Sequence, residues 1–168
     1  TLEYKIKILY ISSSEIFGSE QKHKRNENSK LYYSNYYGYC KQLTSNLINF
    51  YRKKNSFKIS TVIAYNHESF LSPNSHIIKT FIKKFYTAKN KNITIYNSNE
   101  FRNISHVYDF VSLFKKILDL NYCDDFIFAN DKNYKIIDIA QMINKLIYSN
   151  KFNIISKNIS TPKTSRKA

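Results

Sequence analysis

The strongest constraint on the fold of this chain is the alternation of strand-like and helix-like segments along its 168 residues. Runs of β-branched and aromatic residues predict strands, and apolar residues that recur every three or four positions predict the helices between them. The predicted strands cover residues 4–12, 57–65, 92–96 and 125–130, and the predicted helices cover residues 36–53, 75–88, 107–118 and 136–147. Strands that alternate with helices form βαβ units, so the sequence predicts an α/β fold with a parallel sheet and helices on its faces.

The remaining segments set the predicted domain boundaries. The polar stretch 18–34 is typical of a surface loop, and the periodic pattern fades after Asn150. We find neither an internal repeat nor a linker between domains. The sequence therefore predicts one folded unit over residues 1–150, followed by a basic, poorly ordered tail over residues 151–168.

Composition narrows the class of protein further. Hydrophobic residues make up 42% of the chain, with 15 Tyr and 12 Phe, which excludes a disordered segment. No apolar run is long enough to cross a membrane and no signal-peptide pattern opens the chain, so we expect a soluble, cytoplasmic protein without a membrane partner. The two cysteines, Cys40 and Cys123, have no zinc-ligand spacing, so the sequence predicts neither a disulfide framework nor a metal site.

The formal net charge of +15 raises the question of an anionic partner such as nucleic acid. Lys, Asn, Ile, Tyr and Phe are abundant throughout the chain while Gly and Pro are scarce, which is the bias of an AT-rich coding sequence. Part of the charge also lies in the stretch 151–168. We therefore attribute the charge to solvated lysines and keep a basic nucleic-acid-binding module as an alternative interpretation.

Three serines and a carboxylate, Ser12–Glu15, come directly after the first predicted strand. The second predicted strand ends in another polar stretch, residues 66–69, which contains Asn66 and His67. Ligands of parallel α/β sheets bind at the carboxyl ends of the strands. The two stretches are therefore expected on one rim of the sheet, where a ligand site competes with the simpler interpretation of a hydroxyl-rich helix cap.

Tyr37 and Lys41 lie four residues apart on the predicted helix 36–53, so their side chains share one face of it. An ammonium beside a phenol favours the phenolate, which suits the phenol to proton transfer. With 15 Tyr and 27 Lys plus Arg in the chain, such a pair also arises by chance. The pair gains weight because its helix follows a strand that ends in serines and Glu15.

Five segments taken together resemble the extended short-chain dehydrogenase/reductases, and among them the GDP-mannose 4,6-dehydratase family. They are SSSEIFG, YYGYCK, NHES, FRNISHVYDFV and DDFIFANDKNYKIIDIAQMI, in that order, within residues 5–147. The spacings from Glu15 to Tyr37 and from Tyr37 to His67 are those of this family, whereas Tyr-xxx-Lys alone is shared by the whole superfamily. The resemblance implies a partial Rossmann-type parallel sheet with flanking helices, lacking the N-terminal Gly-rich βαβ unit.

The resemblance also implies an activity. Such a lyase oxidises GDP-mannose at C4 with NADP, eliminates water across C5 and C6, and returns the hydride to C6, which gives GDP-4-keto-6-deoxymannose. It implies NADP as the cofactor, with NAD as the alternative, a nucleotide-sugar substrate, and a homo-oligomer when the protein is full length.

Family site residues carry over to eight positions. Ser13 replaces a threonine whose hydroxyl contacts the reacting sugar oxygen, and Glu15 matches the glutamate that removes the C5 proton. Tyr37 matches the tyrosine that takes the O4 proton, and Lys41 matches the lysine that binds the nicotinamide ribose beside it. The other four are expected to contact the substrate (Ser14, Asn66 and Arg102) or the cofactor (His67).

Several positions depart from the family pattern. Ser72 stands where the family has a cofactor-binding arginine, Tyr36 where a proline precedes the tyrosine, and Asn103 and Ser105 where Asp and Gly are usual. The chain has only two glycines and so has no Gly-rich turn for a pyrophosphate. It also begins without methionine, almost directly in a strand. We therefore expect the C-terminal part of a longer enzyme, inactive as this chain alone.

Three interpretations stay open beside the dehydratase. An epimerase or reductase of the same superfamily would share Tyr37 and Lys41, but a simple reductase does not need a carbon-acid base at Glu15. A truncated, inactive relative that only dimerises through the helix of Tyr37 would fit the loss of arginine at Ser72. A nucleic-acid-binding module would show salt-dependent binding to DNA or RNA.

Overall fold

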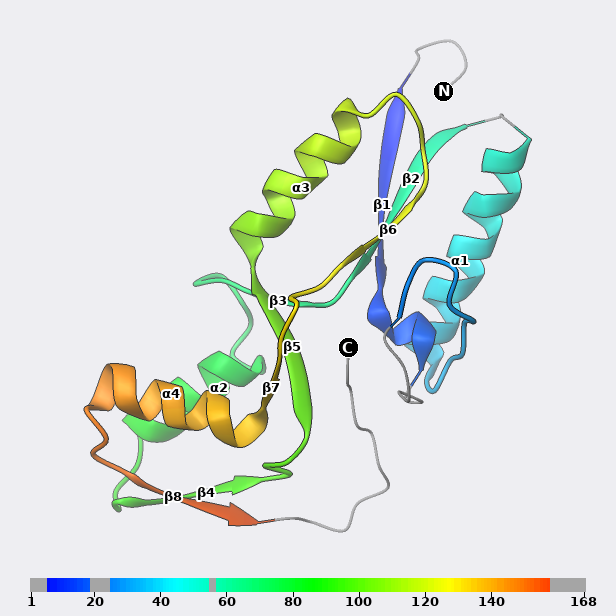
Figure 1. The fold of residues 1–168 in the computed structure, drawn as a ribbon. Helices are drawn as coiled ribbons and strands as arrows, with labels where there is room; N and C mark the ends of the chain where they lie inside the picture. Colours follow the sequence, from blue (N-terminus) through cyan, green and yellow to red (C-terminus); the bar gives the residue numbers. More distant parts are fainter. Residues whose placement is uncertain (1–5, 19–24, 55–56, 158–168) are drawn as a thin grey trace.

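The computed structural model describes residues 6–18, 25–54 and 57–157. The chain forms an upper unit around a central parallel sheet and a lower unit that encloses a second core (Figure 1). The elements of the upper unit are β1 (Lys7–Ser13), the short 3-10 helix η1 (Ser14–Phe17), α1 (Tyr36–Lys53), β2 (Lys58–Ala64), α3 (Val107–Asp119) and β6 (Asp125–Phe128). The remaining elements lie outside the central sheet and its two helices. They are β3 (Asn66–Glu68), α2 (Ile77–Tyr86), β4 (Asn92–Tyr96), β5 (Phe101–His106), β7 (Asn133–Lys135), α4 (Ile136–Tyr148) and β8 (Asn153–Lys157).

The central sheet has the order β1-β2-β6 and is parallel throughout. Strand β2 lies in the middle, and its residues from Ser60 to Ala64 are all buried, as expected for a strand covered on both faces. Helices α1 and α3 lie on opposite sides of this sheet (Figure 1). The α/β fold with a parallel sheet and flanking helices is therefore confirmed.

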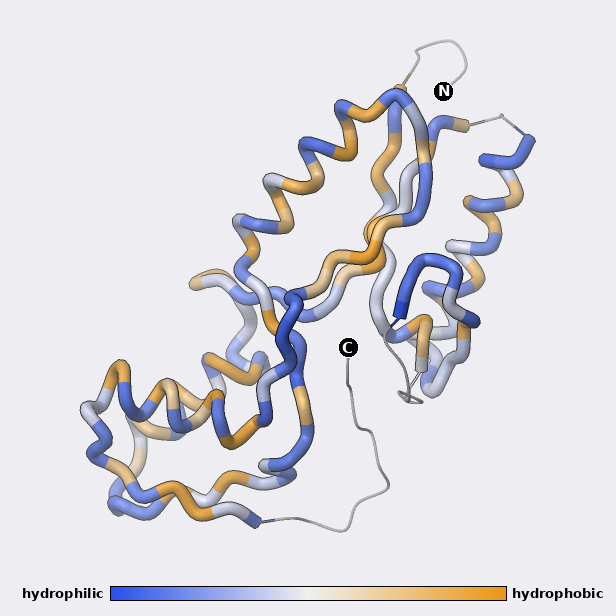
Figure 2. The backbone as a smooth tube through the Cα atoms, viewed as in Figure 1, coloured by the Kyte–Doolittle hydropathy of each residue, from blue (hydrophilic) through white to orange (hydrophobic). Residues whose placement is uncertain are grey.

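Helix α3 packs on the sheet through an apolar stripe. Phe110 and Ile117 are buried against Val62, Ala64 and Phe128 of the strands. Hydrophobic and hydrophilic stretches alternate along α3, as in an amphipathic helix (Figure 2). The periodicity that predicts a helix at residues 107–118 thus also predicts the burial of Phe110 and Ile117, whereas Val111 and Leu118 of the same apolar stripe are exposed.

Helix α1 begins and ends where the sequence predicts, but its buried face differs from its most apolar one. The residues that share an apolar stripe, Cys40, Leu43, Leu47 and Tyr51, are exposed. The sheet is instead contacted by a face whose buried residues are Gly38, Ser45 and Ile48. Small residues on that face let the helix backbone come close to β1.

The other strands form two small sheets. Strands β3, β5 and β7 form one, with β3-β5 parallel and β5-β7 antiparallel, and β4 pairs in parallel with β8. The second core lies between the β4-β8 pair and two helices, where α2 and α4 pack on β4 through Phe81, Phe85, Ile95 and Ile139. The predicted strand 92–96 therefore exists but lies outside the central sheet.

The predicted tail divides into two parts. Residues Asn153–Lys157 form β8, held by Asn144 of α4, which bonds both the N–H and the carbonyl of Phe152 (3.2 and 2.8 Å). Residues 158–168 lie outside the described residues, as do residues 4 and 5 of the first predicted strand and 19–24 of the predicted loop. The domain boundary at residue 150 stays a prediction. None of the helices in the described part has the length and apolar character needed to span a bilayer.

Candidate active site

A cavity of about 630 Å³ opens at the carboxyl ends of β1 and β2. Strand β1 delivers the serines and Glu15 to one wall, and the chain beyond β2 delivers Asn66 and His67 to another. The first turns of α1 add Tyr37 and Lys41. The expectation that the two polar stretches share one rim is confirmed, and every predicted site residue except Arg102 lines this cavity.

Glu15 lies on a tight turn that follows β1 immediately. Ser13 caps η1, because its Oγ accepts a hydrogen bond from the Glu15 amide (3.3 Å). Gly18 ends the turn with a φ of 65°, a left-handed conformation that favours glycine. The turn thereby stops the strand and presents Ser13, Ser14 and Glu15 to the cavity.

The Glu15 carboxylate is tied to helix α1 by Asn35. Asn35 Nδ2 donates to Glu15 Oε2 over 2.8 Å, and Asn35 Oδ1 accepts from the Gly38 amide over 2.8 Å. A side chain at position 38 would put its Cβ 2.6 Å from the Glu15 carbonyl oxygen, so the close approach of helix and turn requires glycine here.

Lys41 contacts both strand β1 and the ring of Tyr37 at the cavity. Its ammonium donates to the Ile11 carbonyl (2.7 Å) and lies 5.7 Å from the centre of the Tyr37 ring and 5.0 Å from that of Tyr10. The shared helix face that the spacing predicts is therefore present. Both rings therefore lie within cation–π range of the Lys41 ammonium.

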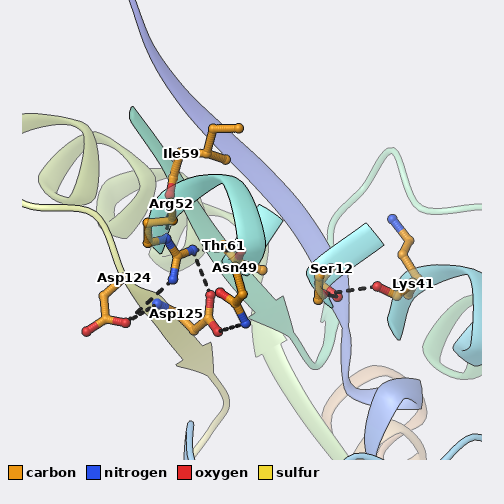
Figure 3. Close-up of polar contacts among 9 residues, drawn as sticks. Ser12, Lys41, Asn49, Arg52, Ile59, Thr61, Asp124 and Asp125 are labelled. Atoms are coloured by element: carbon orange, nitrogen blue, oxygen red, sulfur yellow. Dashed lines mark hydrogen bonds and ion pairs between the residues drawn. The ribbon is translucent and has the colours of Figure 1, made fainter. Parts of the chain in front are cut away.

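Polar contacts fix α1 to the sheet at two levels (Figure 3). Near the cavity, Ser45 Oγ donates to the Lys41 carbonyl (3.0 Å) and lies 3.2 Å from Ser12 Oγ of β1. At the far end of the helix, Arg52 bonds the Ile59 carbonyl (3.0 Å) and Asp125 Oδ1 (2.8 Å). These contacts join both ends of α1 to the strands, and Tyr37 and Lys41 are carried by the helix so held.

Asn66 and His67 sit on β3, which continues the chain just beyond β2. The His67 Nδ1 atom lies 3.0 Å from the Tyr65 carbonyl oxygen, and its ring packs on Phe110 with the centroids 4.6 Å apart. A ring held in this way has a fixed orientation at the cavity wall. Asn66 is exposed there.

Arg102 lies elsewhere. It belongs to β5, where its guanidinium bonds Glu100 Oε2 (2.9 Å) and the Phe101 carbonyl (2.8 Å). It is not among the described residues that line the cavity. Its role in substrate binding remains a prediction.

The polar cavity residues Asn35 and His76 have no role in the sequence interpretation. Asn35 occupies the N-cap of α1, a position at which asparagine before a helical pattern is a recognisable signal. His76 lines the cavity and pairs with the buried Glu68 (Nδ1 to Oε2, 3.2 Å). That pair joins residues on two elements, and no local sequence pattern indicates it.

Tyr65 forms part of the cavity floor and is 7% exposed. Burial raises the pKa of its phenol above the ordinary value of 10.0, against a smaller opposing effect of Arg25. The folded state therefore holds this proton more tightly than the unfolded state, so its contribution to stability is complete below pH 10 and is lost as pH rises above that value.

We expect Tyr65→Phe to weaken the alkaline fall in the free energy of unfolding, measured by urea titration at several pH values. A Tyr96→Phe control, at an exposed position, should leave that slope unchanged.

The arrangement combines a carboxylate, a phenol beside an ammonium, serine hydroxyls and an oriented imidazole around one cavity. Such a set can bind a polyhydroxylated ligand and move protons at two of its atoms. Tyr37 and Lys41 are the residues that could hold the ribose of a nicotinamide nucleotide, since a phenol and an ammonium offer donors to adjacent hydroxyls. Among the described residues, no group of three or more His, Cys, Asp or Glu side chains lies close enough to hold a metal ion.

Comparisons with known proteins agree with the family resemblance of the sequence. The family model described as GDP-mannose 4,6 dehydratase matches residues 1–167. No curated protein matches the chain. The fold is similar to that of a dTDP-glucose 4,6-dehydratase from Bacillus anthracis, with a TM-score of 0.78 at 17% identity, covering 93% of this chain and 51% of that one.

Two further solved structures show the same fold. A putative epimerase from Burkholderia cenocepacia aligns with a TM-score of 0.80 at 15% identity, covering 95% of this chain and 52% of that one. A GDP-L-fucose synthetase from Naegleria fowleri aligns with a TM-score of 0.79 at 15% identity, covering 96% of this chain and 55% of that one. The chain therefore spans about half the length of the structures it matches.

Proposed function

The chain belongs to the GDP-mannose 4,6 dehydratase family, and from that premise we propose that its full-length protein is a nucleotide-sugar 4,6-dehydratase acting on GDP-mannose. The observation that carries this proposal is the placement of Glu15 in one cavity with Tyr37 and Lys41. A carboxylate at that place suits removal of a proton from carbon next to a ketone, a step that oxidation and reduction alone do not need.

The proposed reaction uses a nicotinamide cofactor, NADP, with NAD as the alternative. Related structures support a cofactor of this kind: the Bacillus anthracis dehydratase was solved with NAD, and RMD from Pseudomonas aeruginosa with NADPH. When bound, the cofactor accepts a hydride from the sugar and returns it. Lys41 would hold its ribose beside Tyr37, and His67 would contact it as well.

The remaining steps belong to side chains of this chain. Tyr37 takes the proton from the O4 hydroxyl as C4 is oxidised, and Ser13 donates a hydrogen bond to the same oxygen. The C4 ketone then acidifies the C5 hydrogen, which Glu15 removes. Of the two protons then held by Tyr37 and Glu15, one would leave with the C6 hydroxide as water, and the other would return to C5 when C6 is reduced. Ser14 and Asn66 bind the sugar, and Arg102 would reach the substrate only through a part of it that extends beyond the cavity.

The experiment that tests this proposal uses the full-length protein with NADP and GDP-mannose, following the 4-keto-6-deoxy product. We expect turnover, and we expect Tyr37→Phe to lower it by about 10² to 10⁴-fold, because the O4 proton loses its acceptor. A Tyr39→Phe variant, two residues away, is the matched control and should turn over normally. Failure of the full-length protein to bind either NADP or NAD would reject the enzymatic function.

A second candidate is an epimerase of the same superfamily. It is favoured by the similar folds of epimerases, such as a UDP-N-acetylglucosamine 4-epimerase from Methanobrevibacter ruminantium. An epimerase would return the hydride to C4 and release a sugar that keeps its C6 hydroxyl. The product in the experiment above separates the two activities.

A protein without enzymatic activity would behave differently in the same assays. An inactive relative would assemble through α1 without turnover, and a nucleic-acid module would bind DNA or RNA in a salt-dependent manner. We further propose that the full-length protein is a cytoplasmic homo-oligomer, which sedimentation and cell fractionation would test.

A further inference from the structure

Asn35 uses both ends of its carboxamide at the cavity. Its backbone lies at the N-cap of α1 with φ −153° and ψ 166°, and its Oδ1 accepts from the Gly38 amide over 2.8 Å. An amide N–H only donates, so the atom facing it must be the carboxamide oxygen. The NH₂ end is thereby directed to Glu15, whose Oε2 it meets at 2.8 Å.

This contact joins two elements that both contribute to the cavity. Glu15 lies on the turn after β1, whereas Tyr37 and Lys41 lie in the first turns of α1. The helix rests against the backbone of Glu15, where only a glycine at position 38 leaves room. The Glu15 carboxylate and the first turn of α1, which carries Tyr37, are therefore joined by one short junction.

We propose that Asn35 is a positioning residue that fixes the Glu15 carboxylate relative to the helix of Tyr37, and that it acts on proton removal from carbon but not on hydride transfer. The inference rests on the proposed function. A free glutamate samples several rotamers, and a hydrogen bond from a neutral amide to its charged oxygen restricts them. Misplacement of a reacting group by about 1 Å can cost about 10²-fold in rate.

The chain offers variants that separate the two bonds of Asn35. Asn35→Ser keeps an N-cap oxygen for the Gly38 amide but is too short to reach Glu15, and serine caps helices as well as asparagine does. Asn35→Asp also keeps the cap, and it places a second carboxylate against Glu15. Asn46→Ser, at an exposed position of the same helix, is the control for the substitution itself.

The first test uses single turnovers of the full-length protein with NADP and GDP-mannose. Reduced-cofactor absorbance follows C4 oxidation, and deuterium uptake from solvent at C5 follows proton removal. For Asn35→Ser we expect unchanged C4 oxidation and C5 exchange that is slower by about tenfold to a hundredfold. Asn35→Asp should be slower still at C5, and Asn46→Ser should match the wild type in both.

Two results would overturn the proposal: unchanged C5 exchange in Asn35→Ser, or an equal loss in both steps. The contact is also tested without turnover, by a double-mutant cycle of Asn35→Ser and Glu15→Ala on the unfolding midpoint. Non-additive shifts support the contact, and additive shifts reject it. If the double-mutant cycle shows coupling but the wild-type protein does not oxidise C4, the proposed function is rejected and the contact between Asn35 and Glu15 is still supported.

Discussion

Glu15→Gln in the full-length protein should stop the elimination of water while C4 of the substrate is still oxidised. The amide cannot accept the C5 proton as a base, so we expect product formation to fall by about 10² to 10⁴-fold. Glutamine has nearly the shape of glutamate and still offers an oxygen to Asn35 Nδ2, which now bonds Glu15 Oε2 at 2.8 Å. The junction between the turn and α1 should therefore survive.

The measurement is a single turnover in which reduced cofactor appears and persists instead of being consumed. Tyr37→Phe gives the matched contrast, because its loss lies before the hydride transfer and no reduced cofactor should accumulate. The two variants thus block different steps within one cavity. Normal turnover of Glu15→Gln would show that the base is another group.

The sequence predicts the central part of this fold well because the signal there is local. The apolar stripe of α3 and the continuous apolar run of β2 are set by residues that follow one another in the chain. The rim is predictable for a related reason: β1 and β2 are parallel neighbours, with Ser12 opposite Ile63 and Ser13 opposite Ala64, so the residues that follow them emerge at one edge.

The strands β5, β7 and β8 escape prediction because their sequences are short and polar, as in NYK of β7. Each exists through pairing with a strand distant in the chain, for example Asn92 of β4 with Asn153 of β8. The placement of Arg102 depends on such pairing too, which is why family spacing does not reveal its bond to Glu100.

The buried face of α1 shows a different limit. An apolar stripe at residues 40, 43, 47 and 51 identifies a helix but does not identify what it packs against. The sheet side is selected by close approach, so Gly38 and Ser45 lie there instead. A polar contact between two serines, Ser12 and Ser45, has no signature in either segment alone.

The far end of α1 provides a prediction about stability in which two neighbouring aspartates should differ sharply. Arg52 and Asp125 have side chains only 16% and 19% exposed and meet at 2.8 Å, whereas Asp124 is 67% exposed and lies 3.7 Å from Arg52. Asp125 also accepts from Asn49 Nδ2 (3.3 Å), and the Arg52 guanidinium further donates to Thr61 Oγ1 (3.2 Å) (Figure 3).

Removing one partner of a largely buried ion pair leaves the other charge without compensation. We expect Asp125→Ala to lower the free energy of unfolding by about 3 kcal/mol, since it leaves the largely buried Arg52 charge with only the longer contact to the solvated Asp124. Asp124→Ala removes a solvated pair and should cost less than about 1 kcal/mol. Urea denaturation of the purified protein, with both variants at one pH and salt concentration, gives the comparison.

The position of this cluster makes the result informative about the cavity as well. Arg52 bonds β2 through Ile59 and β6 through Asp125, so it joins the end of α1 to two strands at once. If these bonds fix the position of α1 along the strands, Asp125→Ala should also shift Tyr37 and Lys41, at the other end of the helix, relative to β1. Asp124→Ala should leave their position unchanged. Equal costs for the two variants would mean that the contacts of Ser45 and Lys41 near the cavity are enough to hold the helix in place.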